Sequence, residues 1–111
     1  MPRNRKKRRA PSKPYYDLKE VKRLVVNKRV RINYNALEGA WYAFSWEESD
    51  ILDAIVKLRL NHFQKSDPSE TKPGIILDFY KAPGLNDENV YTHFYIEKET
   101  GILVINSFKG F

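Results

Sequence analysis

The sequence contains no cysteine, which excludes disulfide bonds and thiolate metal sites. It also contains no apolar stretch of the roughly 18 residues that a membrane-spanning helix requires. Its basic beginning is not followed by an apolar segment, so we do not expect a secretory signal. From these absences we expect a protein of the reducing cytoplasm with no membrane partner.

Positive charge is concentrated at the beginning of the chain. Residues 1–14 contain seven lysines and arginines and no acid, whereas the remaining 97 residues contain 13 basic residues (20 − 7) against 14 acids, a net charge of −1. A self-repelling segment with few apolar side chains has nothing to bury, so we predict a disordered tail over residues 1–14. The tail is a sequence-independent binder of RNA phosphates, a solubilising leader or an artefact of the assigned start site. Its proposed RNA contacts are Arg5, Lys6, Lys7, Arg8 and Arg9.

Apolar periodicity predicts helices first and strands afterwards. A helix is expected over residues 16–27 with Asp17 as its N-cap, and a helix pair follows it. The predicted strands are residues 30–32, 62–66, 75–81, 90–97 and 102–109. The connections between the later strands are too short for crossover helices. We therefore predict one α+β domain over residues 15–111, with the helices packed on one face of a mostly antiparallel sheet and with Trp41 and Trp46 in the core.

A second basic cluster belongs to the predicted folded part. Lys28, Arg29 and Arg31 follow the first helix closely, and structured positive charge of this kind attracts a phosphate backbone. We interpret Arg29 and Arg31 as RNA contacts.

The last two predicted strands form a hairpin that gathers polar side chains. Residues 99–101 suit a three-residue loop, in which case the numbers of paired residues sum to 200. In this register Tyr91 lies opposite Lys109 and His93 lies opposite Ser107. A slip of one residue would place these partners on opposite faces, so the register is a decisive part of the prediction.

The chemistry of this face suits a phosphodiester. Alternation places Leu103, Ile105, Ser107 and Lys109 on one face of the last strand, and we expect Lys65 to join them. Ammonium groups neutralise phosphate oxygens, and two neighbouring cations lower each other's pKa, which helps one of them to transfer a proton. RNA cleavage requires no metal or other cofactor, because the ribose 2′-OH is the nucleophile and the protein supplies position and charge.

These residues also have an explanation that involves no catalysis. A lysine at the end of an edge strand prevents aggregation, and a single histidine on a strand is usually solvated. Composition and pattern alone therefore indicate a basic α+β domain that binds nucleic acid, and no more.

Six short motifs occur in order and together cover about residues 15 to 110. They are YDLKEVKRLV, VRINYNAL, HFQKS, LDFY, VYTHF and INSFK. In this order they resemble the MqsR family of bacterial toxins. The resemblance implies a RelE-like fold and a toxin of a type II toxin–antitoxin system. It further implies a sequence-preferring endoribonuclease that cleaves mRNA at GC-containing sites, and a cognate antitoxin that often has a zinc-binding region and a helix-turn-helix region.

The resemblance also implies an active site. By motif, the two catalytic lysines of the family fall on Lys65 and Lys109, and its tyrosine falls on Tyr91. We expect the two lysines to stabilise the charge of the phosphorane and Tyr91 to take part in proton transfer.

One position departs from the family pattern. Leu77 stands where the family commonly has glutamine, and a leucine side chain forms no hydrogen bond. His93 is a candidate replacement because it shares the face of Tyr91, and it is also a candidate acid or base. His62 and Ser107 are further auxiliary candidates.

Two other functions are compatible with the sequence. A catalytically inactive RNA-binding or ribosome-associated protein is favoured by Leu77 and by the basic tail. A structural protein whose exposed strand edge is covered by a partner is the other alternative, but it leaves the placement of Lys109 unexplained.

Overall fold

The computed structural model describes residues 13–111. The predicted disorder of the tail over residues 1–14 falls outside the described residues, except at positions 13 and 14. The proposed RNA contacts of that tail, Arg5, Lys6, Lys7, Arg8 and Arg9, lie outside them as well.

The helices are built from local sequence signals. Helix α1 (Leu18–Val26) begins where predicted, because the Asp17 side chain accepts a hydrogen bond of 3.0 Å from the backbone N–H of Lys19. The helix pair that follows consists of α2 (Tyr34–Phe44) and α3 (Glu48–Val56), and a short 3-10 helix, η1 (Leu60–His62), leads into the sheet. No helix among residues 13–111 is both long and apolar enough to cross a membrane.

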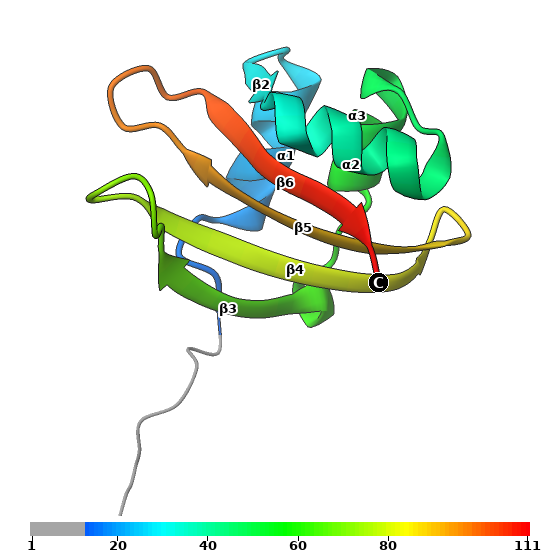
Figure 1. Ribbon diagram of the computed structural model, residues 1–111. Coiled ribbons are helices and arrows are strands. Elements are labelled where there is room, and N and C mark those ends of the chain that lie inside the picture. Colours follow the sequence, from blue (N-terminus) through cyan, green and yellow to red (C-terminus); the bar gives the residue numbers. More distant parts are fainter. Residues whose placement is uncertain (1–12) are drawn as a thin grey trace, which may run out of the picture.

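A five-stranded sheet forms the centre of the fold (Figure 1). Its strands are β2 (Val30–Ile32), β3 (Phe63–Pro68), β4 (Ile76–Leu85), β5 (Glu88–Ile96) and β6 (Leu103–Gly110). They lie in the order β2-β6-β5-β4-β3, and only the short β2 runs parallel to its neighbour, β6. The predicted α+β class with a mostly antiparallel sheet is confirmed.

The connection between β4 and β5 is much shorter than the sequence suggested. Strands had been expected to stop at residue 81 and to resume at residue 90, but pairing continues to Leu85 and starts again at Glu88. Only Asn86 and Asp87 form the turn, with φ angles of 50° and 69°. Both residue types tolerate this left-handed conformation, which is typical of tight hairpin turns.

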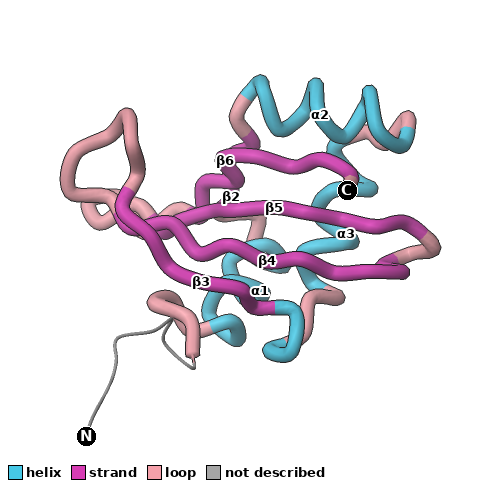
Figure 2. Tube along the Cα trace, turned by 60° about the horizontal axis from the view of Figure 1, so that its bottom comes forward, coloured by secondary structure: helices cyan, strands magenta, loops and turns pink. Residues whose placement is uncertain are grey.

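The helices cover one face of the sheet and leave the other open (Figure 2). The main core lies between them, and it includes Val21, Ile51, Ile55, Tyr80, Phe94, Ile105 and Phe108. The prediction for Trp46 holds in part, since it is partly buried and packs against this core. The prediction for Trp41 is wrong, because this residue is 58% exposed. Helix α2 buries its alanine face instead, through Ala36 and Ala40.

Helix α2 approaches β6 unusually closely at Gly39. A Cβ atom at this position would lie 2.2 Å from the carbonyl oxygen of Phe108 and 3.7 Å from the Cβ of Lys109. Only glycine permits this approach, so the helix position and the position of Lys109 depend on each other.

A buried carboxylate attaches the first described residues to the sheet. Asp78 of β4 is fully buried, and it accepts hydrogen bonds from the backbone N–H groups of Tyr15 (3.1 Å) and Tyr16 (2.8 Å). It also accepts the hydroxyl of Ser66, which follows Lys65 on β3. Three donors satisfy the buried carboxylate and fix the strand that carries Lys65.

Candidate active site

The predicted register of the last hairpin is confirmed where the candidate residues lie. Tyr91 pairs with Lys109, and His93 pairs with Ser107. Beyond His93 the register shifts by one residue, because Asn106 is an additional residue in β6 and forms a β-bulge.

This bulge reverses the alternation of β6. Leu103 and Ile105 are fully buried in the main core on the helix side, whereas Lys109 lies opposite Tyr91 on the open side. The prediction that Ser107 and Lys109 share a face with Leu103 and Ile105 is therefore wrong. The extra residue lets one strand fill the core with its first half and present Lys109 on the open face with its second half.

A second bulge, in β3, likewise moves the residues that follow it to the other face of the sheet. Phe63 pairs with Tyr80 and packs against the main core, while Lys65 pairs with Phe79 after a register shift at Gln64. Without the extra residue, Lys65 would follow Phe63 onto the helix side. Each lysine thus reaches the open face through a bulge in its own strand.

Three aromatic rings lie between the two lysines. The ring of Phe79 is 4.5 Å from that of His93 and 6.3 Å from that of Tyr91, measured between centroids. The Nζ of Lys65 is 4.9 Å from the centre of the Phe79 ring, and the Nζ of Lys109 is 5.4 Å from the centre of the Tyr91 ring. Cations above ring faces beside further rings form a surface suited to the phosphates and bases of a nucleic acid.

The electrostatic state of Lys65 differs from the expectation. Its ammonium group lies 2.9 Å from the carboxylate of Asp67, two residues further along the same strand face. Hydrogen bonding to Asp67 and the charge of this carboxylate raise the pKa of Lys65. The prediction of a lowered lysine pKa is therefore wrong at this position, since the pKa of Lys65 is raised.

Lys109 has no such partner. None of the ion pairs among residues 13–111 involves it, and its Nζ lies 5.4 Å from the centre of the Tyr91 ring. Its charge is thus the more available of the two for an anionic ligand.

His93 lies between the two lysines and is neutral. Its pKa is lowered to about 4, first by burial and then by the positive charges of Lys109 and Lys65. Its Nδ1 is 3.2 Å from the side-chain nitrogen of Asn106, the bulge residue.

The remaining auxiliary candidates lie in different surroundings. His62 belongs to η1, where its Nδ1 accepts the backbone N–H of Arg59 (3.0 Å). Its pKa is lowered by burial and by the charges of Arg59 and Lys22 of α1, so its environment is not that of the lysines on the open face. Ser107 lies opposite His93, and its carbonyl accepts the hydroxyl of Thr92 (2.6 Å).

Leu77 lies at the border of the candidate site. Its side chain is 6% exposed and packs with Tyr95 and Val104 in a small apolar cluster on the open face. It also lines a cavity of about 360 Å³ together with Lys65 and His93. The position is therefore within reach of a ligand that enters the cavity.

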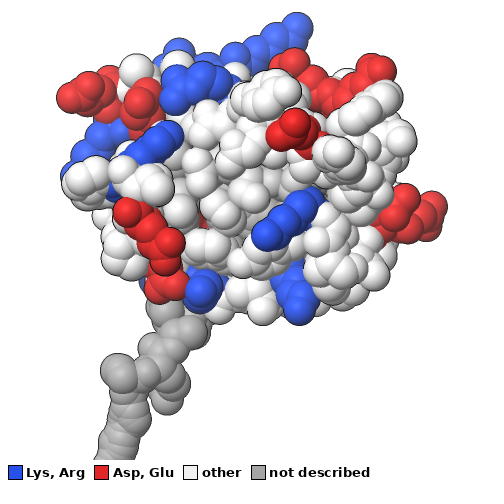
Figure 3. All heavy atoms as spheres, viewed as in Figure 1, with Lys and Arg blue, Asp and Glu red and all other residues white. Residues whose placement is uncertain are grey.

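Two further lysines extend the open face, and the sequence reasoning missed both. Lys81 pairs with Tyr91, and its Nζ is 4.7 Å from the ring centre of Phe111. Lys72, in the β3–β4 loop, has its Nζ 5.7 Å from the ring centre of Tyr95. In Figure 3, lysine and arginine side chains are spaced over a largely uncharged surface in front of the sheet. The position of Lys81 two residues after Phe79 was the available signal.

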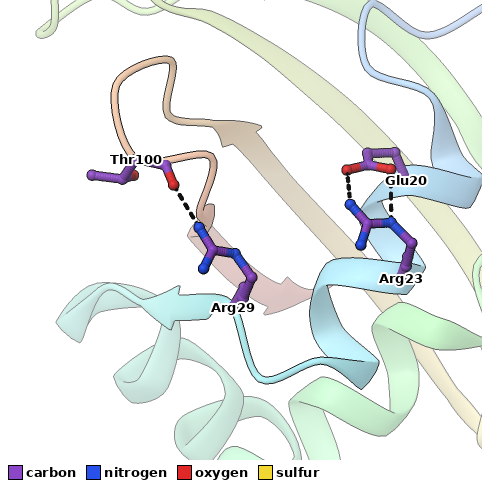
Figure 4. A network of polar contacts seen from close by, with 4 residues as sticks. All are labelled: Glu20, Arg23, Arg29 and Thr100. Carbon is purple, nitrogen blue, oxygen red and sulfur yellow. Dashed lines mark hydrogen bonds and ion pairs between the residues drawn. The ribbon is translucent and has the colours of Figure 1, made fainter.

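The two arginines predicted to contact RNA have different environments. Arg31 pairs with Val104, a member of the apolar cluster on the open face, and so lies on the same face as the lysines. Arg29 instead donates a hydrogen bond of 2.7 Å from Nη2 to the carbonyl oxygen of Thr100 in the β5–β6 loop (Figure 4). The structure thus brings Arg31 to the candidate face and engages Arg29 in holding the hairpin loop.

Within residues 13–111, no group of three or more histidine, cysteine or acidic side chains is arranged to hold a metal ion. The chemistry of the face is that of lysines, aromatic rings and one neutral imidazole.

The fold and this face together define a small α+β protein that offers a cationic, aromatic surface to an anionic ligand. The family model described as motility quorum-sensing regulator, toxin of MqsA, matches residues 13–110. The chain belongs to the MqsR toxin family and is a toxin of a toxin–antitoxin system, with MqsA as the antitoxin of the family. No curated protein matches the chain.

Proposed function

We propose that this toxin is a sequence-preferring endoribonuclease that cleaves mRNA in the cytoplasm and thereby inhibits translation and growth. Residues 15–111 form its RelE-like toxin domain. The ribose 2′-OH attacks the adjacent phosphodiester, so the reaction requires neither a metal nor another cofactor. The observation that carries the proposal is the placement of Lys65 and Lys109 on one open face by two separate bulges.

The proposed roles follow from the electrostatics of the site. Lys109 and Lys65 stabilise the negative charge of the phosphorane, and Lys109 contributes more because Asp67 partly neutralises Lys65. The hydroxyl of Tyr91, whose ring adjoins Lys109, takes part in proton transfer. Neutral His93 does not carry charge in this scheme.

Regions outside the central cluster increase RNA affinity. Arg31, Lys72 and Lys81 extend the positive face, and the basic residues of the tail add sequence-independent attraction to phosphates. The cognate antitoxin is proposed to carry a zinc-binding region and a helix-turn-helix region.

The experiment is cleavage of a GC-containing RNA by the wild-type protein, by Lys109→Ala and by Lys98→Ala. Lys98 is exposed in the β5–β6 loop, so its replacement removes the same charge away from the site. Loss of the stabilising cation should slow Lys109→Ala by about 10²–10³-fold, while Lys98→Ala should cleave at the wild-type rate. Equal cleavage by all three proteins would eliminate Lys109 from the mechanism.

A second candidate function is RNA binding without cleavage. It is favoured by Leu77, which supplies no hydrogen bond, and by the ion pair that occupies Lys65. This function predicts salt-sensitive RNA binding, no cleavage products, and loss of most of the affinity when residues 1–14 are deleted.

A further inference from the structure

Three polar side chains form a hydrogen-bonded chain that ends in the candidate site. The Nδ2 of Asn33 donates to the Oδ1 of Asn106 (3.0 Å), and the Nδ2 of Asn106 lies 3.2 Å from the Nδ1 of His93. Asn33 is the N-cap residue of α2, yet its side chain makes no capping bond. An N-cap asparagine ordinarily bonds the helix N–H groups. Here the Asn33 side chain donates its hydrogen bond to Asn106 instead.

The direction of the hydrogen bonds from Asn33 through Asn106 determines the tautomer of His93. Because the Oδ1 of Asn106 accepts from Asn33, its Nδ2 faces the imidazole. An amide nitrogen only donates, so the Nδ1 of His93 accepts and the proton of the neutral ring resides on Nε2. The low pKa of His93 keeps the ring neutral at physiological pH.

The Nε2–H group is accessible. Among residues 13–111, the only buried side-chain nitrogen or oxygen without a hydrogen-bond partner is the hydroxyl of Tyr80. The Nε2 of His93 has no hydrogen-bond partner among these residues and does not belong to that buried group, so it is at least partly exposed to solvent. His93 lines the cavity of about 360 Å³, which is also lined by Leu77, Phe79, Asp67 and Glu70.

The cavity wall favours a neutral group over a phosphate. Lys65 also lines the cavity, but its ammonium group is paired with Asp67, so the charged side chains Lys65, Asp67 and Glu70 give the wall a net charge of −1 (+1 − 2). Leu77 and the Phe79 ring offer apolar surface to a planar base. A fixed, uncharged N–H donor in such a cavity selects a hydrogen-bond acceptor on the base.

We propose that this cavity is a nucleobase subsite in which the Nε2–H of His93, oriented by Asn33 and Asn106, selects a keto oxygen. The subsite prefers guanine to adenine, or uracil to cytosine, at one position of the RNA, because the disfavoured base presents an amino group there. The inference rests on the proposed RNA cleavage and assigns one element of its sequence preference.

Cleavage-site mapping on an RNA pool with randomised sequence tests the subsite. The wild-type protein should favour the keto base at one position by about tenfold, the contribution of one hydrogen bond. His93→Ala should still cleave but lose this preference, and His93→Gln, which restores an N–H donor, should keep it. An unchanged preference in His93→Ala would overturn the proposal.

The tautomer is tested independently of activity by ¹⁵N NMR of the imidazole. His93 should show the Nε2–H form without protonation from pH 8 down to about 5.5, and Asn106→Ala should populate both tautomers. An Nδ1–H form in the wild-type protein would refute the donor assignment.

If the wild-type protein leaves every RNA intact, the nuclease proposal fails and the subsite is judged by binding. In that case short RNAs that differ only by guanine or adenine at one position are titrated into wild type and His93→Ala. A tenfold discrimination that disappears in the variant supports the subsite, and equal discrimination by both proteins overturns it.

Discussion

The close approach of α2 to β6 makes Gly39→Ala a decisive substitution. The new Cβ would lie 2.2 Å from the Phe108 carbonyl oxygen, and real contacts of this kind stay above 3.0 Å, so helix and strand must separate by at least 0.8 Å (3.0 − 2.2). Overpacking of this kind costs about 1–3 kcal/mol, while the better helix propensity of alanine returns at most about 1 kcal/mol. Because the clash is with backbone atoms, the upper end of the overpacking range applies, and we expect a net loss of about 2 kcal/mol (3 − 1) in unfolding free energy.

Urea unfolding followed by tryptophan fluorescence measures this loss, since Trp46 packs against the core. Asn35→Ala is the control, because it raises helix propensity at an exposed position of the same helix without a steric conflict. The substitution should also displace Lys109, whose Cβ is 3.7 Å from the new methyl group, and so slow RNA cleavage. A Gly39→Ala protein as stable as the wild type would refute the account of α2 packing.

Three further predictions concern the open face. His93 takes up a proton near pH 6.5 in the unfolded chain but only near pH 4 in the folded protein, so the free energy of unfolding decreases as the pH falls from 6.5 to 4. Over this range the wild type should lose about 1–3 kcal/mol more than His93→Gln, as measured by urea unfolding at each pH. Arg31→Ala should weaken RNA binding and reduce the salt slope by about 1. Arg29→Ala should leave both unchanged, because that guanidinium is bonded to the loop, and a larger effect at Arg29 would contradict the assignment. Leu77→Gln should cost about 1–3 kcal/mol of stability for a poorly satisfied buried amide, against less than about 1.5 kcal/mol for Leu77→Met; thermal unfolding of both decides whether the apolar cluster needs this leucine.

Much of the fold and part of the candidate site could be predicted from local signals in the sequence. The Asp17 cap and the pairing of Tyr91 with Lys109 were predictable, because each depends on neighbours in sequence or on one short loop. The two bulges were not predictable, since neither Gln64 nor Asn106 is a glycine or proline, the residue types that usually mark an irregularity in a strand. Such an extra residue can be recognised only in the folded structure, where the residues before it and the residues after it alternate out of phase between the core face and the open face.

The remaining errors have equally physical causes. Trp41 was assigned to the core because it is aromatic, but α2 packs too closely on β6 for a large side chain, and its small residues are buried there instead. The raised pKa of Lys65 comes from Asp67 at the i+2 position of the same strand. Alternation alone could have placed these two groups side by side. The chain from Asn33 to His93 requires the folded structure, since it joins residues far apart in the sequence.

The parallel pairing of β2 with β6 has a consequence for folding kinetics. The hydrogen bond between Asn33 and Asn106 joins residues 73 positions apart, and the bond from Tyr15 to Asp78 spans 63 positions. Closing such long loops costs chain entropy before the contacts that stabilise them can form, so we expect slow, cooperative folding. Neither the helical part nor the strand hairpins complete the sheet alone. Proteolytic fragments that separate β2 from β6 should therefore be without toxicity even when they retain every candidate catalytic residue.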